Sequence, residues 1–523
     1  MIGIGHLGTK TARVAPDRAA LIDPKVGLTR TFGQLESRTE NLARALTGLF
    51  EAGNGRRVAA LSQNCIDLME LYLATAKAGS LLFPVNWRFS PTQVRQALEA
   101  ATPSVVFYHS DFRDIIAEVR GTVDIEHWIE WTPGRHSEYE EVLEKATRSA
   151  SGLVLPNPQT LLHQPYLAIS TGGTTGIPKS AVHTQYSYSA CMLDYLAAAR
   201  VTADDTYLML GQLFHVVGYM GLAYLAMGRP VVIAEFDVDD LLGVIEAEQV
   251  TGFFAIATML PRLVNAAEEK GIDASAIRQV EYGGAPTAEG VIRGAGDIFE
   301  CDLLQAWGMT EFGPGTYLSP GDHRRALAGD RPELLRSCGT PALFSDLAIL
   351  DEDGIPVPHD GTTLGEICHR GPNNMTGYWN QPEQTAETLR DGWIHTGDGG
   401  AWDADGHVFI LDRMKSMIIS GGENIFPAEI ERTLGNHPAI AEVIVVGVPH
   451  PDWGEVVKAT VVRRPGSHLT PDEVRDFVGN ELASYKKPRI VEFLDELPVT
   501  PTGKVNRTLL ASAPLPEVRS EHP

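Results

Sequence analysis

Short apolar segments alternate with amphipathic segments along this chain, and this alternation limits most strongly how the chain can fold. The runs "YLAIS" (166–170) and "VVIAEF" (231–236) have the length and apolar character of strands, and "DDLLGVIEAEQV" (239–250) follows with a helical pattern. Such alternation is typical of parallel sheets covered by helices. The expected fold class is therefore α/β.

The chain is long enough for several folding units. Its 523 residues, 43% hydrophobic and 21% charged, indicate a globular protein of about three units. The polar segments near 131–160 and 319–333 are expected to be long loops. From about residue 415 the elements become compact, and Thr470 with Glu473 predicts a capping box. We expect a small separate α+β domain there.

Composition and charge exclude several classes of partner. The formal net charge of −24 opposes a broad nucleic-acid or anionic-membrane surface. The N-terminus lacks the pattern of a secretory signal, and the apolar run 216–228 is short enough to be a buried helix rather than a membrane span. Five scattered cysteines without a CxxC pair favour a reducing compartment, so a cytoplasmic protein is expected.

The loop "ISTGGTTGIPKSAV" (169–182) is rich in glycine, threonine and lysine, which suits an anion such as phosphate. It is not the common phosphate-binding loop, because Pro178 stands directly before Lys179 where that pattern has glycine. It also lacks the GxGxxG fingerprint of dinucleotide-binding folds. From these residues alone, a surface turn remains the alternative.

Five further motifs follow this loop in order. They are "YGGAP" (282–286), "WGMTE" (307–311), "WIHTGD" (393–398), "LDRMKSMIISGGENIFPAEIE" (411–431) and "PTGKVNR" (501–507). Taken together, the motifs resemble the adenylate-forming superfamily of acyl-CoA synthetases, luciferases and peptide-synthetase adenylation domains. The chain looks closest to the stand-alone bacterial acyl-CoA synthetases.

The resemblance implies a fold and a two-step reaction. The implied large N-terminal domain (1–414) holds two sheet-and-helix subdomains and a small β-barrel, and a small mobile α+β domain (415–523) follows. A carboxylate attacks the α-phosphate of ATP to give an acyl-adenylate and pyrophosphate, and a thiol then displaces AMP. The implied cofactors are ATP, Mg²⁺ and CoA.

The resemblance also assigns roles around the triphosphate, where charge builds during the reaction. Thr310 and Glu311 match the pair that contacts phosphate and carries Mg²⁺; for Glu311 the alternative is an ordinary surface acid. The residues that match the cradle of the β- and γ-phosphates, or else form a solvated turn, are Thr171, Gly173, Thr174, Thr175, Gly176 and Lys179.

Other positions match contacts to the nucleoside. Asp398 matches the carboxylate that accepts the ribose hydroxyls and Arg413 matches a second ribose contact, although the two could instead form a structural ion pair. Trp307 stands where the family usually has the tyrosine that stacks on adenine. The small residues that let adenine and the acyl group lie against backbone are Gly283, Gly284 and Ala285.

The C-terminal motifs imply a domain that serves two steps. Lys504 matches the catalytic lysine that bridges the carboxylate and the α-phosphate during adenylation. Lys415 matches the hinge, and Gly421 and Gly422 would line the tunnel for the pantetheine arm. Lys486 and Lys487 could make the entrance for CoA positive, or they could be surface residues that favour solubility.

The acyl pocket is implied at positions with apolar or small side chains. By resemblance these are His215, Val216, Gly218, Tyr219, Gly221, Leu222, Ala257, Thr258 and Gly308. The stretch 214–228 holds no Asp or Glu to meet an ammonium group, which argues against an amino acid substrate. His215 could orient the carboxylate or gate the pocket, and a buried structural histidine is the alternative.

These matches predict an ATP-dependent acid:CoA ligase for a hydrophobic monocarboxylic acid, whether fatty, aryl or polycyclic. The alternative is a stand-alone adenylating enzyme that delivers its acyl group to a carrier protein or a partner enzyme. A homologue that only binds nucleotide is disfavoured because Lys504, Glu311 and Asp398 are all present. We expect no nucleic-acid partner and no membrane span, and either a monomer or a homodimer.

Overall fold

The computed structural model describes residues 3–49, 56–149, 154–171, 179–413, 416–421, 423–498 and 505–512. The chain divides into two compact units, of which unit 1 comprises Met1–Leu347 with Cys368–His395, and unit 2 comprises Ala348–Ile367 with Thr396–Pro523. Neither unit is therefore one continuous segment. The predicted division between residues 414 and 415 falls outside the described residues and stays a prediction.

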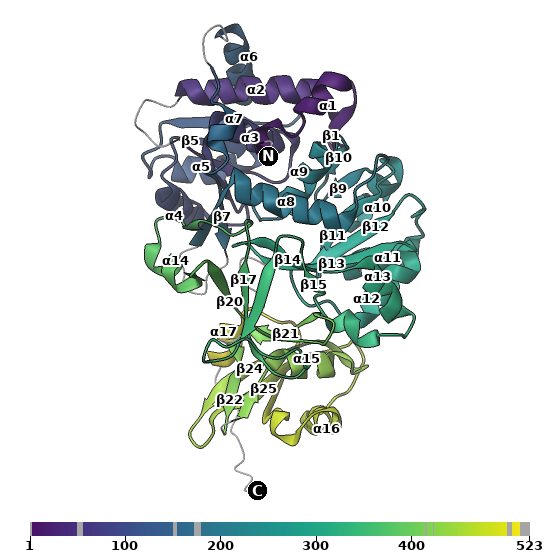
Figure 1. Ribbon diagram of the computed structural model, residues 1–523. Helices are drawn as coiled ribbons and strands as arrows, with labels where there is room; N and C mark the ends of the chain where they lie inside the picture. The colour runs from purple at the N-terminus through teal and green to yellow at the C-terminus, as the bar shows by residue number, and fades with distance from the viewer. Residues whose placement is uncertain are drawn as a thin grey trace. The chain divides into compact units, whose positions relative to one another are not determined.

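Unit 1 contains a large, mainly parallel sheet (Figure 1). Over the described ranges it has nine strands, in the order β15 (Thr340–Pro341), β14 (Gly313–Leu318), β13 (Asp302–Met309), β12 (Gln279–Gly283), β11 (Gly252–Ile256), β9 (Tyr207–Met209), β10 (Val231–Ile233), β1 (Ala19–Asp23) and β2 (Leu28–Thr31). The strands from β13 to β1 are parallel, whereas β14, β15 and β2 run antiparallel to their neighbours at the edges.

A second sheet of unit 1 carries the predicted anion-binding loop. Its seven strands within the described ranges are β18 (Gly377–Tyr378), β8 (Lys179–Thr184), β7 (Pro165–Thr171), β4 (Leu81–Val85), β3 (Arg57–Leu61), β5 (Val105–His109) and β6 (His127–Trp131). The strands β7 and β8 form an antiparallel hairpin in which Thr171 pairs with Lys179. The remaining loop residues, 172–178, lie outside the described part of the chain.

Helices cover both sheets, as the α/β expectation requires. They are α1 (Thr9–Val14), α2 (Phe32–Leu49), α3 (Ile66–Ala78), α4 (Pro91–Ala101), α5 (Arg113–Val119), α6 (Glu138–Ser149), α7 (Pro158–Leu161), α8 (Gln185–Ala199), α9 (Gly218–Ala226), α10 (Val238–Ala247), α11 (Leu260–Lys270), α12 (Glu289–Phe299), α13 (Pro320–Leu327) and α14 (Pro382–Thr388). The predicted buried helix within 216–228 is confirmed as α9, which is buried from Gly218 to Leu225.

Two segments expected to be long loops contain helices instead. The segment 131–160 contains α6, in which Tyr139 and Leu143 are four residues apart and both buried, so one narrow apolar stripe holds a strongly polar helix on the core. The segment 319–333 contains α13, and the hydroxyl of Ser319 caps this helix by accepting from the Asp322 N–H. The narrow apolar stripe of α6 and the N-terminal cap of α13 are therefore enough to stabilise a helix in a segment of polar composition.

A third sheet corresponds to the small β-barrel that the resemblance implies. Its strands are β16 (Asp346–Leu350), β17 (Gly365–Arg370), β20 (Trp393–Trp402) and β19 (Leu389–Arg390) in order, and β21 (Val408–Arg413) pairs with β20. The boundary between the two units falls within β16, β17 and β20.

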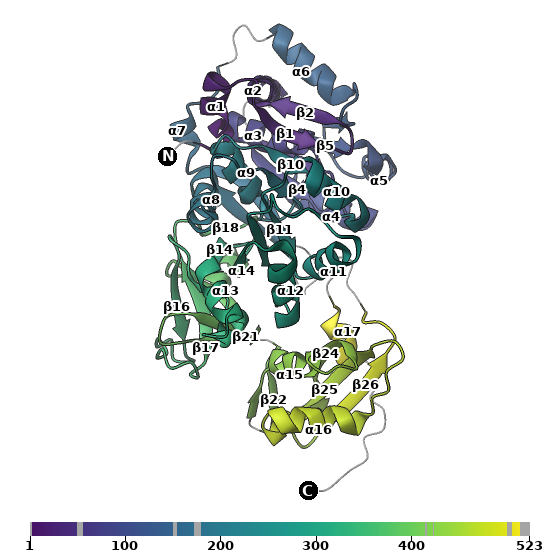
Figure 2. The same cartoon turned by 90° about the vertical axis from the view of Figure 1, so that its right-hand side faces the viewer.

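The remaining described residues of unit 2 form a smaller sheet with helices beside it (Figure 2). The strands are β23 (Glu423–Ile425), β22 (Ile418–Ser420), β25 (Gly454–Arg463) and β24 (Ile440–His450) in order, with β26 (Ile490–Leu494) beside β25, and the helices are α15 (Pro427–Gly435), α16 (Pro471–Glu481) and α17 (Arg507–Ser512). Helices α15 and α16 pack on one face of this sheet, where Ile430 and Val474 are fully buried. The predicted capping box of Thr470 and Glu473 is confirmed at the start of α16.

No disulfide joins the five cysteines, all of which lie in the described part of the chain. Cys65, Cys191, Cys338 and Cys368 are buried and Cys301 is half-buried. No helix in the described ranges combines the length and the apolar character needed to cross a membrane.

Candidate functional site

Lys179 stands at the start of β8, beside the predicted phosphate loop. Alternate residues of a strand share a face, so Lys179, Ala181 and His183 point to the same side of β8. On that side, the ammonium group of Lys179 lies 5.0 Å from the centre of the Tyr378 ring, a distance at which a cation and a ring attract each other. The predicted cation is therefore held beside an aromatic face rather than in open solvent.

The same tyrosine contacts the predicted magnesium ligand. Glu311 is only 5% exposed, and its Oε1 accepts a hydrogen bond of 2.6 Å from the Tyr378 hydroxyl. The Met375 N–H donates to the Glu311 carbonyl at 2.7 Å, which fixes the turn after β13. Because hydrogen bonds to charged groups contribute about 1.5–3 kcal/mol, Tyr378 is a strong positioning contact that joins Lys179 to Glu311.

A buried histidine fixes Thr310, the neighbour of Glu311. His183 Nε2 lies 2.7 Å from the Thr310 carbonyl oxygen, and its Nδ1 lies 3.3 Å from the Ser187 hydroxyl. Burial lowers the pKa of His183 to about 4, so the ring is neutral near pH 7. A carbonyl can only accept, so the single ring proton lies on Nε2 and donates to Thr310.

Sequence reasoning missed both Tyr378 and His183. Tyr378 is 67 positions from Glu311, and His183 is 127 positions from Thr310, so no local pattern links these pairs. A signal was available for His183, because it lies four residues after Lys179 and would share its face if the apolar residues that follow the loop formed a strand. For Tyr378, which stands between "MTG" and "WN", the neighbouring sequence contains no pattern that identifies it as a site residue.

The predicted adenine contacts gather at the carboxyl ends of β12 and β13, which are parallel neighbours. Gly283 pairs with Ala306, and a Cβ added to Gly283 would lie 2.2 Å from the Ala306 carbonyl oxygen, so no other residue fits there. Gly284 and Ala285 follow with exposed backbone. The half-buried Trp307 comes directly after Ala306, with its ring 5.7 Å from that of Phe312. Ligands of open α/β sheets bind at such carboxyl ends.

Several predicted acyl-pocket residues also lie close together. A Cβ added to Gly308 would lie 1.8 Å from the Gly313 carbonyl oxygen, and the Tyr219 ring lies 3.8 Å from the Cβ position of Gly313. Gly313 therefore brings Gly308 and Tyr219 side by side. The Tyr188 ring lies 6.3 Å from the Tyr219 ring, and its hydroxyl donates to the Val216 carbonyl at 2.9 Å.

The other pocket candidates differ in exposure. Gly218 packs against the Tyr188 hydroxyl, which would lie 2.9 Å from an added Cβ. Leu222 is fully buried in the core, and Ala257 is half-buried in the turn after β11. The side chain of His215 is exposed, with its ring 4.4 Å from the Phe214 ring. The alternative of a buried structural histidine is therefore wrong, and the imidazole is accessible to a ligand.

In unit 2, the predicted ribose contacts meet across two strands. Asp398 in β20 is buried and pairs in register with Arg413 in β21. The Asp398 N–H donates to the Thr396 hydroxyl oxygen at 3.0 Å, and that hydroxyl donates to the Ile367 carbonyl at 2.6 Å. The backbone just before Asp398 is therefore fixed by β17, and β21 pairs with the residues that follow it.

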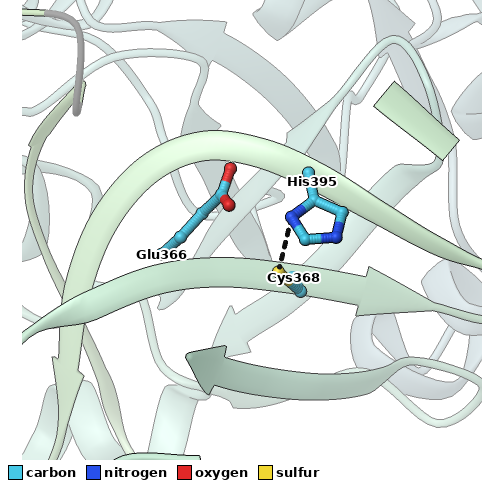
Figure 3. A group of neighbouring side chains, drawn as sticks. All are labelled: Glu366, Cys368 and His395. Atoms are coloured by element: carbon cyan, nitrogen blue, oxygen red, sulfur yellow. Dashed lines mark hydrogen bonds between the residues drawn. The ribbon is translucent and has the colours of Figure 1, made fainter. Parts of the chain in front are cut away.

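The side chains that precede Asp398 in β20 are held in the same way (Figure 3). His395 lies with its Nδ1 3.5 Å from the sulfur of Cys368, and the Gly397 N–H donates to Oε1 of Glu366 at 3.0 Å. Glu366 and Cys368 alternate along β17, so they present their side chains to the same face. These contacts explain why a motif of small and polar residues is an ordered strand.

The remaining predicted residues of the C-terminal segment fall into two groups. Gly421 is described, and a Cβ added to it would lie 2.5 Å from the Trp453 ring. Lys486 forms an ion pair of 2.6 Å with Glu429, so its charge is compensated within unit 2. The predicted site residues outside the described part of the chain are Gly173, Thr174, Thr175, Gly176, Lys415, Gly422 and Lys504.

Comparisons with known proteins identify the family of the chain. A family model described as AMP-binding enzyme matches residues 9–379, and a model described as AMP-binding enzyme C-terminal domain matches residues 429–504. The chain is 34% identical over 510 residues to a feruloyl-CoA synthase of an Amycolatopsis species, across 96% of this chain and 97% of that protein. It is 36% identical over 512 residues to an indoleacetate–CoA ligase of Aromatoleum aromaticum, across 95% of each chain.

A solved structure supports the same assignment across both units. The amide bond synthetase McbA from Marinactinospora thermotolerans matches with a TM-score of 0.85 and 28% identity, across 98% of this chain and 99% of that one. The α/β class predicted from the alternation of elements is confirmed. From its ordered motifs, its site and these matches, the chain belongs to the adenylate-forming AMP-binding enzyme family.

Proposed function

We propose that the chain is an ATP-dependent acid:CoA ligase that activates a hydrophobic monocarboxylic acid through an acyl-adenylate and releases AMP and pyrophosphate. The observation that carries this proposal is the contact of Tyr378 with both Lys179 and Glu311. This contact places a cation near a carboxylate in unit 1. The same unit contains the carboxyl ends of β12 and β13, where the adenine contacts are predicted. The feruloyl-CoA synthase and indoleacetate–CoA ligase matches support the acid:CoA ligase class and favour an aryl acid.

The side chains present fit magnesium and a triphosphate. Glu311 offers a hard carboxylate oxygen of the kind that Mg²⁺ prefers, and the Tyr378 hydroxyl holds that carboxylate in place. Magnesium bound to ATP would neutralise charge on the phosphate oxygens. Lys179 would place its positive charge against the β- and γ-phosphates together with Thr171 and the loop that follows, while Thr310 contacts phosphate.

The proposed nucleoside contacts follow the sequence assignment. Gly284 and Ala285 are exposed and leave room for adenine, while the buried Gly283 allows the close approach of β12 to β13 beside them. Trp307 offers a flat indole face for stacking. Asp398 accepts the ribose hydroxyls and Arg413 supplies the second ribose contact. Lys504 acts in adenylation by bridging the acid and the α-phosphate, where negative charge increases in the transition state.

We further propose that the exposed His215 orients the carboxylate of the acid at the mouth of a pocket formed with Val216, Gly218, Tyr219 and Gly308. Leu222 and Ala257 complete this pocket. The His215 ring can donate a hydrogen bond to one carboxylate oxygen. The pocket stretch carries no acidic residue, which favours an acid without an ammonium group.

The two half-reactions are assigned to two arrangements of a C-terminal domain, residues 415–523, on a large domain, residues 1–414. Lys415 serves as the hinge, and Gly421 and Gly422 leave room for the pantetheine arm of CoA. The scattered cysteines, none of which forms a disulfide in the described part of the chain, suit a reducing compartment, so we propose a cytoplasmic enzyme, monomeric or homodimeric.

The experiment that tests the function is product analysis by mass spectrometry. The purified chain is mixed with ATP, Mg²⁺, CoA and a pool of fatty, aryl and amino acids, with a parallel reaction lacking ATP. We expect an acyl-CoA from an aryl or fatty acid together with AMP and pyrophosphate. The Glu311→Gln variant serves as a control against a contaminating ligase, and its product should fall at least about 100-fold.

Other products would change the assignment in defined ways. Acyl-adenylate and AMP without thioester would overturn CoA as the acceptor and favour delivery to a carrier protein or a partner enzyme. Selective activation of an amino acid would contradict the proposed hydrophobic pocket. Absence of any acid-dependent AMP would contradict the proposed activity as a whole.

A further inference from the structure

A buried carboxylate lies on the strand that leads to the predicted adenine and acyl contacts. Glu281 in β12 is 2% exposed and precedes Gly283 by two residues, so both face the same side of the sheet at about 7 Å spacing. Glu281 Oε1 accepts a hydrogen bond of 2.7 Å from the Tyr195 hydroxyl. Its Oε2 is buried and has no hydrogen-bond partner among the described residues.

This carboxylate lies next to the proposed acyl pocket. The Tyr195 ring, whose hydroxyl bonds Glu281, packs edge-on against the Tyr219 ring with 5.9 Å between their centres. Tyr219 is a proposed pocket residue and lies against Gly313, which in turn contacts Gly308. Burial raises the pKa of Tyr219, and the nearby Cys191 and Glu281 raise it further, so Glu281 is close to that ring. If the end of a bound acid opposite its carboxylate lies against Tyr219, that end is therefore also close to Glu281.

Other polar atoms in the same region also have no partner. The Tyr224 and Tyr317 hydroxyls and Oδ2 of Asp194 are buried and unpartnered within the described ranges. A cavity of about 240 Å³ has Asp194, Tyr317 and Leu304 in its wall, and Leu304 pairs in register with Glu281. We call Glu281, Tyr224, Tyr317 and Asp194 the distal polar cluster.

Such a cluster is unfavourable unless a ligand satisfies it. Each buried polar atom without a partner costs about 1–3 kcal/mol, and more when it is charged. Burial raises the pKa of Glu281 to about 7, which expresses the same cost of an unsolvated carboxylate. An alkyl chain would leave the acceptor unsatisfied, whereas a ring O–H or N–H group would donate to it.

We propose that the distal polar cluster recognises a hydrogen-bond donor on the far edge of an aromatic acid, a phenolic O–H or an indole N–H, with Oε2 of Glu281 as the acceptor. This inference rests on the proposed acid:CoA ligase function and names the substrate class of the same pocket. Glu281 is then a specificity-determining residue that takes no part in the chemical step.

The test compares matched acids that differ only in the donor. We would measure kcat/KM for acyl-CoA formation with 4-hydroxycinnamic acid and cinnamic acid, and with indole-3-acetic acid and 1-naphthaleneacetic acid. The wild-type chain should favour the donor-bearing acid of each pair by about 10- to 100-fold, because an unpaired buried acceptor penalises the analogue.

Variants separate Glu281 from general effects on the pocket. In Glu281→Leu the preference should fall below about threefold, through loss of activity on the donor-bearing acids. Tyr195→Phe removes the donor to Oε1 but keeps the carboxylate, so the preference should remain. Asp23→Asn, which alters a buried carboxylate elsewhere in unit 1, should also retain it. If Glu281→Leu does not fold, Glu281→Gln, which keeps the shape but loses the charge, should give an intermediate preference.

The outcomes distinguish this inference from the function on which it rests. Equal kcat/KM for both members of each pair, or an undiminished preference in a folded Glu281 variant, would overturn the role of the distal polar cluster and leave the ligase function intact. A preference for saturated fatty acids over all four aromatic acids would also overturn it. Formation of no acyl-CoA from any acid would instead contradict the proposed function.

Discussion

At the scale of single residues, Tyr378 connects the two charges that the proposed reaction needs. Its hydroxyl donates to Glu311 and its ring face lies under the Lys179 ammonium. Replacing Tyr378 by Phe removes the first contact and retains the second. We expect Tyr378→Phe to lower kcat/KM for acid-dependent ATP–pyrophosphate exchange about tenfold, which corresponds to about 1.4 kcal/mol.

The control for this prediction is Tyr378→Leu, which removes both contacts and should reduce exchange further. Thermal unfolding of both variants would show that the loss is not due to misfolding. Unchanged exchange in Tyr378→Phe would mean that the Glu311 carboxylate does not depend on this hydrogen bond.

A second residue-scale prediction concerns His323, whose ring is buried between the Tyr282 hydroxyl at 2.8 Å and the Ser319 carbonyl at 2.9 Å. Burial lowers the pKa of His323 to about 4 from its ordinary 6.5. Between these values the unfolded chain binds a proton that the folded chain does not. Acidification from pH 6.5 to 4 should therefore lower the contribution of His323 to the free energy of unfolding by about 1.4 kcal/mol per pH unit.

Urea unfolding of unit 1 at pH 6.5, 5.5 and 4.5 would check this, with His323→Gln as the reference. The variant lacks the titrating ring. The free energy of unfolding of the wild-type chain minus that of the variant should therefore decrease by about 1.4 kcal/mol for each pH unit of acidification. A difference that stays constant with pH would show that His323 does not resist protonation in the folded state.

At the scale of elements, the close approach of β12 to β13 can be tested at Gly283. An added Cβ would lie 2.2 Å from the Ala306 carbonyl oxygen, and backbone cannot move aside as a flexible side chain can. We expect Gly283→Ala to destabilise unit 1 by about 1–3 kcal/mol and to impair ATP binding, because the strand ends must separate. Thermal unfolding and nucleotide titration would measure the two effects.

Gly290→Ala is the matched control, since Gly290 lies in α12 and an added Cβ meets nothing within 4 Å. This change should stabilise the chain slightly, by about 0.4–1 kcal/mol, and leave nucleotide affinity unchanged. Equal behaviour of the two variants would contradict the steric explanation.

Sequence patterns predicted elements better than they predicted contacts. The apolar run that became α9 and the Thr470 capping box were accessible because their signals are local. Helix α6 was missed because charged residues dominate it and only a narrow stripe, including Tyr139 and Leu143, is apolar. The contacts of Tyr378 with Glu311 and of His183 with Thr310 could not be predicted, because β18 and β8 come close to the turn after β13 only in the folded chain.

At the scale of the whole molecule, the prediction concerns the division of work between the two half-reactions. Lys504 is proposed to act in adenylation alone. We expect Lys504→Ala to lower acid-dependent pyrophosphate release at least about 100-fold, while thioester formation from supplied acyl-adenylate and CoA stays within about twofold. Single-turnover assays of the separate steps would measure both, with the exposed Lys270→Ala as a control that should affect neither.

If Lys504→Ala slowed both half-reactions equally, one arrangement of the chain would serve both steps. Motion between the parts would then have no role in the reaction. The motifs alone imply such a division, since the resemblance assigns one lysine to one step and the glycines at 421 and 422 to the other.

The state of the cysteines has a practical consequence for measuring that motion. No disulfide joins the five described cysteines, four of them are buried, and burial raises the pKa of the half-buried Cys301 to about 12. Because only the thiolate reacts, the native chain should label slowly with maleimide dyes. One new surface cysteine in each unit would then carry a fluorophore with little background. Energy transfer between the two dyes could follow the catalytic cycle without first removing any natural cysteine.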